Sequence, residues 1–210
     1  PVPRFGTGPI SPGENTVRFT SSVPRPAQWS AEKPNLYRLR LKLRQGDRLL
    51  ETIERTIGFR RVSVRGSQLC VNGRRAKLAG ACRHELDPLT GRADTARHAE
   101  GDVKLLKAAN LNYIRTAHYP PTRELLDAAD RLGMYVEVEA PFCWVGNDAN
   151  PEHLRAVLTP TSAMVDYHHS HPSVILWSLA NESQFNPLFE ASAQLARDLE
   201  DPEYRKRFEA

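Results

Sequence analysis

Four places in the sequence carry side chains that can move protons or hold charge, each following an apolar stretch. The most informative of these places is "HPSVILWSLANES" (171–183), in which an apolar strand pattern is followed, without a turn residue, by Asn181 and Glu182. A carboxylate placed among basic groups can act as a general acid, a general base or a nucleophile. Many strands also end in polar residues for no chemical purpose, so this ending alone leaves both interpretations open. The other three places are 82–85 (Cys82, Arg83, His84, Glu85), 115–119 and 137–139.

The segments that connect these places alternate between strand and helix patterns. Repeated strand–helix units imply a parallel sheet, which carries its functional residues at the carboxyl ends of its strands. Because parallel strands bring those ends to one edge, we expect Glu182 to face a site shared with the other three places. The predicted strands are 76–81, 112–116, 134–140 and 174–179. The predicted helices are 99–109, 122–133 ended by Gly133, Pro160 to His168 with Thr159 as the cap, and a last segment from about Pro187.

Residues 1–62 follow a different pattern. Prolines are dense in residues 1–34, which is typical of loops and edge strands. Along residues 38–44 basic and apolar side chains alternate, and this period of two indicates a strand. The "QGD" at 45–47 is a hairpin turn signal. We interpret residues 1–62 as the later strands of a β-sandwich.

The composition argues against several classes of protein. The chain of 210 residues has a net charge of +4. Its basic residues are concentrated in residues 1–66 but are spread along alternating strands without an RNA-binding motif, so we expect no nucleic-acid partner. The three cysteines form no CxxC pair, which argues for reduced thiols and against a disulfide scaffold or a zinc ribbon. No apolar run approaches about 18 residues, so we expect no membrane span and no membrane partner.

Four longer stretches resemble one known family. "NYIRTAHYPPTRELLDAADRLGMYV" (112–136) and "HPSVILWSLANES" are similar to the two signatures of glycoside hydrolase family 2, which holds β-galactosidases, β-glucuronidases and β-mannosidases. "WSAEKPNLYRLRLKL" resembles strands of the family's sandwich, and "GFRRVSVRGSQLCVNGRRAKLAGACRHELDPLTGR" resembles its join to the catalytic barrel. The resemblance covers about residues 26–184. It implies part of an immunoglobulin-like β-sandwich domain over 1–62 and the N-terminal half of a (β/α)8 TIM barrel, an α/β fold, over 63–210.

The resemblance implies retaining hydrolysis of β-glycosides, and "RHELDPLTGR" leans toward the β-galactosidases. Such enzymes hold two carboxylates about 5–5.5 Å apart. Glu182 matches the family's general acid/base, which protonates the leaving oxygen and later activates water. Glu139 is either a second catalytic carboxylate or a structural one bound to Arg115 or His118. Because the family uses this position as a support, we favour a supporting role for Glu139 and Arg115.

The resemblance also implies which side chains bind the sugar substrate. Asn181 matches an asparagine that forms a hydrogen bond with the sugar 2-OH, and such bonds strengthen in the transition state. His118 and Tyr119 match the family's "HYP" segment, whose histidine lies near the sugar. Arg83 and His84 match a basic pair after the first barrel strand.

The chain departs from the family pattern at several points. Ser170 and Cys82 each stand where the family commonly has Asn. "EAPFCWVG" (139–146) lacks the Glu and His that supply magnesium in some β-galactosidases, so we expect no metal and no cofactor. A full barrel takes roughly 250 residues, and too few follow Glu182 to reach the seventh strand, where the family has its nucleophilic Glu.

These departures lead to a second interpretation of the function. We expect the nucleophile beyond the end of this chain and expect the 210 residues alone to be inactive. The alternative is a catalytically inactive fragment that serves carbohydrate binding or assembly. A cytoplasmic location is favoured, and a homo-oligomer of the full-length protein stays open.

The remaining motifs decide less. The rings of Phe142 and Trp144 suit either stacking on a sugar face or loop packing, and the pattern does not choose between them. The histidines of "HHSHPS" lack the spacing of a metal motif and precede the fourth strand, at the edge opposite the expected site. We expect them to be exposed or to cap a helix; they are His168, His169 and His171.

Overall fold

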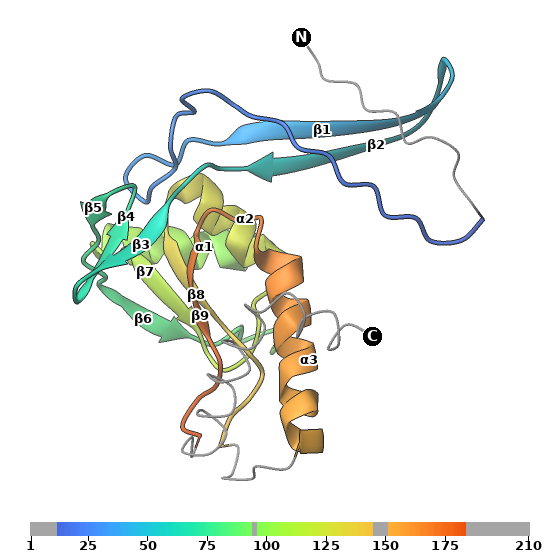
Figure 1. The fold of residues 1–210 in the computed structure, drawn as a ribbon. Helices are drawn as coiled ribbons and strands as arrows, with labels where there is room; N and C mark the ends of the chain where they lie inside the picture. The colour runs from blue at the N-terminus through green and yellow to red at the C-terminus, as the bar shows by residue number, and fades with distance from the viewer. Residues whose placement is uncertain (1–11, 94–95, 145–150, 184–210) are drawn as a thin grey trace.

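The computed structural model describes residues 12–93, 96–144 and 151–183 of the chain (Figure 1). Two small antiparallel units come first, and a four-stranded parallel sheet with three helices follows. The antiparallel strands are β1 Tyr37–Gln45, β2 Arg48–Ile57, β3 Val62–Arg65, β4 Gln68–Val71 and β5 Arg74–Arg75. The parallel strands are β6 Gly80–Arg83, β7 Tyr113–Thr116, β8 Tyr135–Glu139 and β9 Val174–Ser178. The helices are α1 Ala96–Ala108, α2 Arg123–Leu132 and α3 Pro151–His168.

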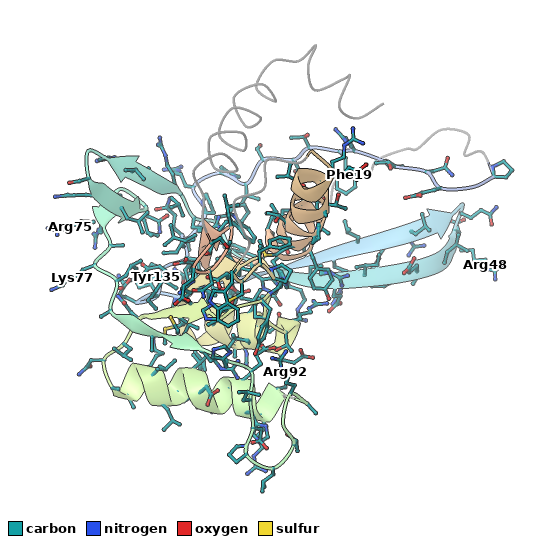
Figure 2. All side chains as sticks on the ribbon, turned by 90° about the horizontal axis from the view of Figure 1, so that it is seen from below. Phe19, Arg48, Arg75, Lys77, Arg92 and Tyr135 are labelled. Atoms are coloured by element: carbon teal, nitrogen blue, oxygen red, sulfur yellow. The ribbon has the colours of Figure 1, made fainter. Side chains whose placement is uncertain are left out.

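Strands β1 and β2 form a long antiparallel hairpin, as the alternating pattern and the "QGD" turn predict. Gly46 has a φ of +56°, a backbone conformation that tight hairpin turns need and glycine adopts without steric cost. The hairpin reaches away from the sheet, and Figure 2 shows Arg48 at its far end, distant from Tyr135 in the interior. Leu39 and Leu43 are exposed along it, because the described part of the chain supplies no second layer to cover them.

The four C-terminal strands lie in the order β6-β7-β8-β9, and every neighbouring pair is parallel. This confirms the prediction from the strand–helix alternation. The register places Cys82 beside Arg115 and Arg115 beside Glu137. The carboxyl ends of all four strands therefore meet at one edge of the sheet, which we call the carboxyl rim.

All three helices contribute to one apolar core against the sheet. Their buried residues include Val103 of α1, Leu125 and Leu126 of α2, and Met164 of α3. Helix α2 ends at Gly133, as predicted, and this residue has a left-handed φ of +77°. A Cβ at Gly133 would lie 2.2 Å from the carbonyl oxygen of Ala31, so glycine also permits the close approach of the N-terminal segment.

A second cluster joins the N-terminal segment to the amino ends of the parallel strands. Trp29 is fully buried, contacts the Tyr135 ring edge-on at 5.8 Å, and donates its indole N–H to the carbonyl oxygen of Asp130 at 2.9 Å. Arg60 donates to the carbonyl oxygens of Pro172 and Val174 at 2.9 and 2.5 Å. Burial lowers the pKa of Arg60 and the nearby charge of Asp130 opposes that effect. These contacts fix the two parts of the chain against each other.

Two predicted boundaries are wrong for identifiable reasons. The strand expected over 76–81 is β6 at Gly80–Arg83, because Ala76 instead donates its N–H to Leu69 of the preceding antiparallel unit. The helix expected to begin at Pro160 begins at Pro151, so Pro160 lies inside α3 and Thr159 is no cap. Proline does suit a first helical position, but a different proline fills it. The segment expected from about Pro187 lies outside the described residues.

Candidate active site

Glu139 is the hub of the carboxyl rim. Its side chain is 0% exposed, and its Oε2 accepts hydrogen bonds from Arg115 Nε at 2.6 Å and Ser178 Oγ at 2.9 Å. Its Oε1 lies 2.7 Å from Nδ1 of His118. A buried carboxylate is tolerated only when opposite charge and donors compensate it, and here both oxygens are engaged. The geometry is that of a carboxylate which holds other groups in place.

Arg115 links Glu139 to Asn181, which follows the end of β9. Its Nη2 donates to Oδ1 of Asn181 at 3.0 Å, and its Nη1 lies 3.6 Å from the Cys82 sulfur. Burial tends to lower the pKa of Arg115, but its bonds to Cys82 and Glu139 outweigh that effect and raise it. Burial, followed by the charge of Glu139, raises the pKa of Glu137, whose carboxylate lies 3.8 Å from the Arg115 guanidinium. The Arg115 guanidinium, on β7, therefore contacts side chains of β6, of β8 and of the loop after β9.

Asn181 and Glu182 follow β9 and are tied to the loop after β8. The Asn181 N–H donates to the carbonyl of Phe142 at 2.7 Å, and the Trp144 N–H donates to the carbonyl of Asn181 at 3.0 Å. The Asn181 side-chain amide donates to the Cys143 sulfur at 3.3 Å. The Trp144 indole N–H donates to Oε2 of Glu182 at 2.7 Å. The exposed Glu182 is thus held by an aromatic residue whose part the sequence did not reveal.

His84, His118 and Tyr119 form an aromatic group beside this network. The His84 ring lies 5.3 Å from the His118 ring, edge-on, and 6.0 Å from the Tyr119 ring. The guanidinium of Arg92 lies over the Tyr119 ring at 5.0 Å (Arg92 is labelled in Figure 2). Three of the predicted sugar-binding side chains are therefore neighbours at the rim. The Ala117–His118 peptide bond that precedes them is cis.

Arg83, also expected to bind sugar, has much of its guanidinium engaged elsewhere. Its Nε donates to Asp102 of helix α1 at 2.7 Å, and its Nη1 lies 3.5 Å from Glu85. Glu85, to which the sequence assigned no role, also accepts from the backbone N–H and the hydroxyl of Thr122 at 2.8 and 3.0 Å. These bonds fasten the end of β6 to both α1 and the start of α2.

The histidines before β9 differ from the sequence expectation. His168 and His171 are buried, not exposed, because their rings lie beside each other at 6.3 Å and His171 packs against Asp130 of α2. Nδ1 of His171 lies 2.7 Å from Oδ2 of Asp130, and the Ser173 N–H donates to the other Asp130 oxygen at 2.9 Å. Burial, with a smaller contribution from His171, lowers the pKa of His168 to about 4. The third histidine, His169, is exposed as expected.

The described residues also contain a cavity of about 420 Å³, but it lies away from the rim. It is bounded by the hairpin β1–β2 and the outer face of α2, with Arg38, Glu54, Arg123 and Asp127 among its lining residues. Its arginines and carboxylates are mixed, so it presents no field of one sign. The chemically organised part of the molecule is therefore the open carboxyl rim.

A parallel strand–helix sheet with a carboxylate, an amide, an arginine and histidines at its carboxyl rim has the architecture of a TIM-barrel enzyme domain. Residues 62–204 match the family described as "Glycosyl hydrolases family 2, TIM barrel domain", and residues 6–60 match "Glycosyl hydrolases family 2". The chain belongs to glycosyl hydrolase family 2. It contains part of the family's sandwich domain followed by part of its TIM barrel.

Relatives from several bacteria agree with this membership. The chain is 41% identical over 179 residues to a β-galactosidase of Aeromonas hydrophila, covering 80% of this chain and 17% of that protein. It is 35% identical over 205 residues to a β-galactosidase of Lactobacillus delbrueckii subsp. bulgaricus, covering 90% of this chain and 20% of that protein. The chain thus spans about a fifth of the length of these curated relatives.

Solved structures agree on the fold. A family 2 glycosyl hydrolase from Bacteroides cellulosilyticus is 34% identical, with a TM-score of 0.67 over 76% of this chain and 21% of that one. A β-glucuronidase from Ruminococcus gnavus, in complex with C6-substituted uronic isofagomine, is 29% identical. Its TM-score is 0.75 over 80% of this chain and 30% of that one. Among the described residues, no helix is both long and apolar enough to cross a membrane.

Proposed function

We propose that the protein carrying this chain hydrolyses O-glycosidic bonds of β-glycosides with retention of configuration, and that β-galactosides are its main substrates. The observation that carries the proposal is the Asn181–Glu182 pair at the carboxyl rim, held through Arg115 to the buried Glu139. The relatives named β-galactosidase support the choice of sugar. A carbohydrate is accordingly the partner that we propose for the site.

Glu182 acts as the general acid/base in this proposal. It protonates the glycosidic oxygen as the bond breaks, and afterwards it removes a proton from the water that releases the sugar. Its exposed position at the rim gives a substrate and a water molecule access to the carboxylate. Glu139 is a poor candidate for the nucleophile, because Arg115, His118 and Ser178 occupy both of its oxygens. We propose that the nucleophile is a carboxylate outside the described residues.

The neighbouring side chains bind the sugar in this proposal. Asn181 uses its second amide N–H toward the sugar 2-OH, because one N–H is given to Cys143 and Arg115 fixes the oxygen. His118, His84 and Tyr119 form the adjacent wall. We keep Arg83 in this group, although its bonds to Asp102 and Glu85 suit it better to orienting His84, its neighbour in the chain.

We also propose that the sandwich domain gives way to the barrel domain between residues 62 and 63. Strand β2 of the hairpin ends at Ile57, and β3 at Val62–Arg65 pairs with β4 and not with the hairpin, which supports a change of domain close to this point.

The test is Glu182→Gln in the complete protein, assayed on aryl β-galactosides with poor and good leaving groups. We expect kcat/KM to fall by about 10²–10⁴-fold on the poor leaving group, because proton donation is lost. The loss should be much smaller on 2,4-dinitrophenyl substrates, and azide should restore the second step. Glu124→Gln, on the exposed start of α2, is the matched control. Near-normal activity of Glu182→Gln on a poor leaving group would remove Glu182 from this role.

A further inference from the structure

Two adjacent residues of the loop after β8, Cys143 and Trp144, contact two adjacent residues after β9, Asn181 and Glu182. A parallel bridge pairs Cys143 with Asn181, and two backbone hydrogen bonds flank it. The side chains repeat this register, since Cys143 contacts the amide of Asn181 and Trp144 contacts the carboxylate of Glu182. The loop after β8 therefore contacts both Asn181 and Glu182, the two residues after β9 to which the proposed function assigns roles.

The backbone at this contact is in a conformation that side chains rarely adopt. Trp144 has a φ of +58° and Glu182 a φ of +47°, and neither residue is glycine. Left-handed conformations of such residues cost on the order of 1–3 kcal/mol and persist only where the surroundings hold them. Trp144 is 73% exposed, so packing does little to hold it. Within the described part of the chain, its hydrogen bonds to Asn181 and Glu182 in the loop after β9 are contacts that can do so.

The chemistry of the indole group fixes which partner donates in the hydrogen bond between Trp144 and Glu182. An indole N–H is a donor only, and it has no lone pair with which to accept. Oε2 of Glu182 accepts this N–H, so Oε2 must offer a lone pair to Trp144 and cannot point a proton at it. When Glu182 is in its acid form, the proton belongs on the other oxygen, Oε1.

We propose that Trp144 is a positioning residue for Glu182: its indole N–H holds Oε2, so that Oε1 is the oxygen that delivers the proton to the glycosidic bond and later takes one from water. This inference rests on the acid/base role proposed for Glu182. It assigns to Trp144 a function other than sugar stacking or loop packing.

The test compares Trp144→Phe with Trp144→Ala in the complete protein. Phe keeps an aromatic ring but removes the N–H. We expect Trp144→Phe to lower kcat/KM by about tenfold to a hundredfold on aryl β-galactosides with poor leaving groups, the range for a hydrogen bond to a charged group. The loss should be less than about threefold on 2,4-dinitrophenyl β-galactoside, which needs little proton donation.

The separation of kcat from KM supplies a second readout, which a stacking role would not reproduce. Loss of a contact that positions Glu182 should lower kcat on poor leaving groups and leave KM nearly unchanged, whereas loss of a stacking contact should raise KM. Trp177→Phe is the matched control, because Trp177 is also partly exposed and lies within β9 itself. We expect that variant to keep the wild-type kcat, KM and leaving-group dependence.

The outcomes separate the two proposals. If Glu182→Gln loses activity on poor leaving groups while Trp144→Phe matches wild type in both readouts, the role of Trp144 is refuted and that of Glu182 stands. If Trp144→Phe is normal and Trp144→Ala raises KM, the ring stacks on substrate and the positioning role is wrong. If Glu182→Gln keeps near-normal activity on poor leaving groups, the acid/base role proposed for Glu182 is refuted, and the inference about Trp144 falls with it.

Discussion

The two ends of the parallel sheet use the same pair of groups in different ways. At the carboxyl rim Nδ1 of His118 lies 2.7 Å from buried Glu139, and at the amino end Nδ1 of His171 lies 2.7 Å from buried Asp130. The His171 side chain is 9% exposed, and the Asp130 carboxylate also binds the backbone of Ser173. The His118 side chain is 27% exposed.

What differs is the group to which each pair is connected. Asp130 binds the buried Trp29 through its carbonyl and the buried Ser173 N–H through its carboxylate, and these bonds lead away from the carboxyl rim. Glu139 leads through Arg115 to Asn181, the neighbour of the exposed Glu182. A buried carboxylate–histidine pair therefore does not indicate a catalytic site by itself. We interpret the amino-end pair as a fastening of the fold and the rim pair as a support for chemistry.

The largest expected effect is that of Glu139→Gln, which removes the charge that compensates Arg115 and changes the group that faces Nδ1 of His118. Breaking a buried ion pair costs about 3–5 kcal/mol of stability, and urea unfolding measures that loss. Because Asn181 would also lose its fixed orientation, we expect kcat/KM to fall at least about a hundredfold. The control is Glu137→Gln: burial and Glu139 already raise the pKa of Glu137, so neutralising it should cost less on both measures.

Asp130→Asn tests the other side of the comparison. We expect a stability loss of about 3 kcal/mol, because His171 and the Ser173 N–H lose a charged acceptor. The kcat/KM of the folded protein should remain within about twofold of wild type. An activity loss as large as that of Glu139→Gln, measured at a temperature where both variants are folded, would erase the distinction between the two ends.

His168 makes the amino end sensitive to pH. Its pKa is lowered to about 4 in the folded protein from an ordinary value of 6.5, so the unfolded chain binds the proton more tightly. Stability is then greatest above pH 6.5 and falls as the pH drops from 6.5 toward 4. The loss should reach at most about 3 kcal/mol. Urea unfolding at pH 7 and pH 4 should show a smaller difference in His168→Phe and an unchanged one in the exposed control His169→Gln.

The smallest expected effect is that of Trp29→Phe, which removes the indole hydrogen bond to the Asp130 carbonyl and some buried ring area. We expect a loss of about 1–3 kcal/mol, visible as a lower unfolding midpoint with unchanged kcat/KM. A change in the leaving-group dependence of this variant would mean that the amino end also acts on the chemistry, contrary to the comparison.

The sequence alone determined the main architecture and the composition of the rim. Strand–helix alternation predicted the parallel sheet, "QGD" predicted the hairpin turn, and Gly133 predicted the end of α2. The parallel rule then placed Arg115, Glu139 and Asn181 at one edge. These features follow from local periodicity and from turn residues, which are visible within a few positions of the chain.

Only the tertiary structure decided which of these groups contact one another. Trp144 and Glu182 are 38 positions apart, and Glu139 and Arg115 are 24 apart. No local pattern shows that Glu139 is compensated at both oxygens or that an indole holds Glu182. The burial of His168 was missed for the same reason. Contacts of this kind depend on how distant segments pack, and local spacing carries no information about that packing.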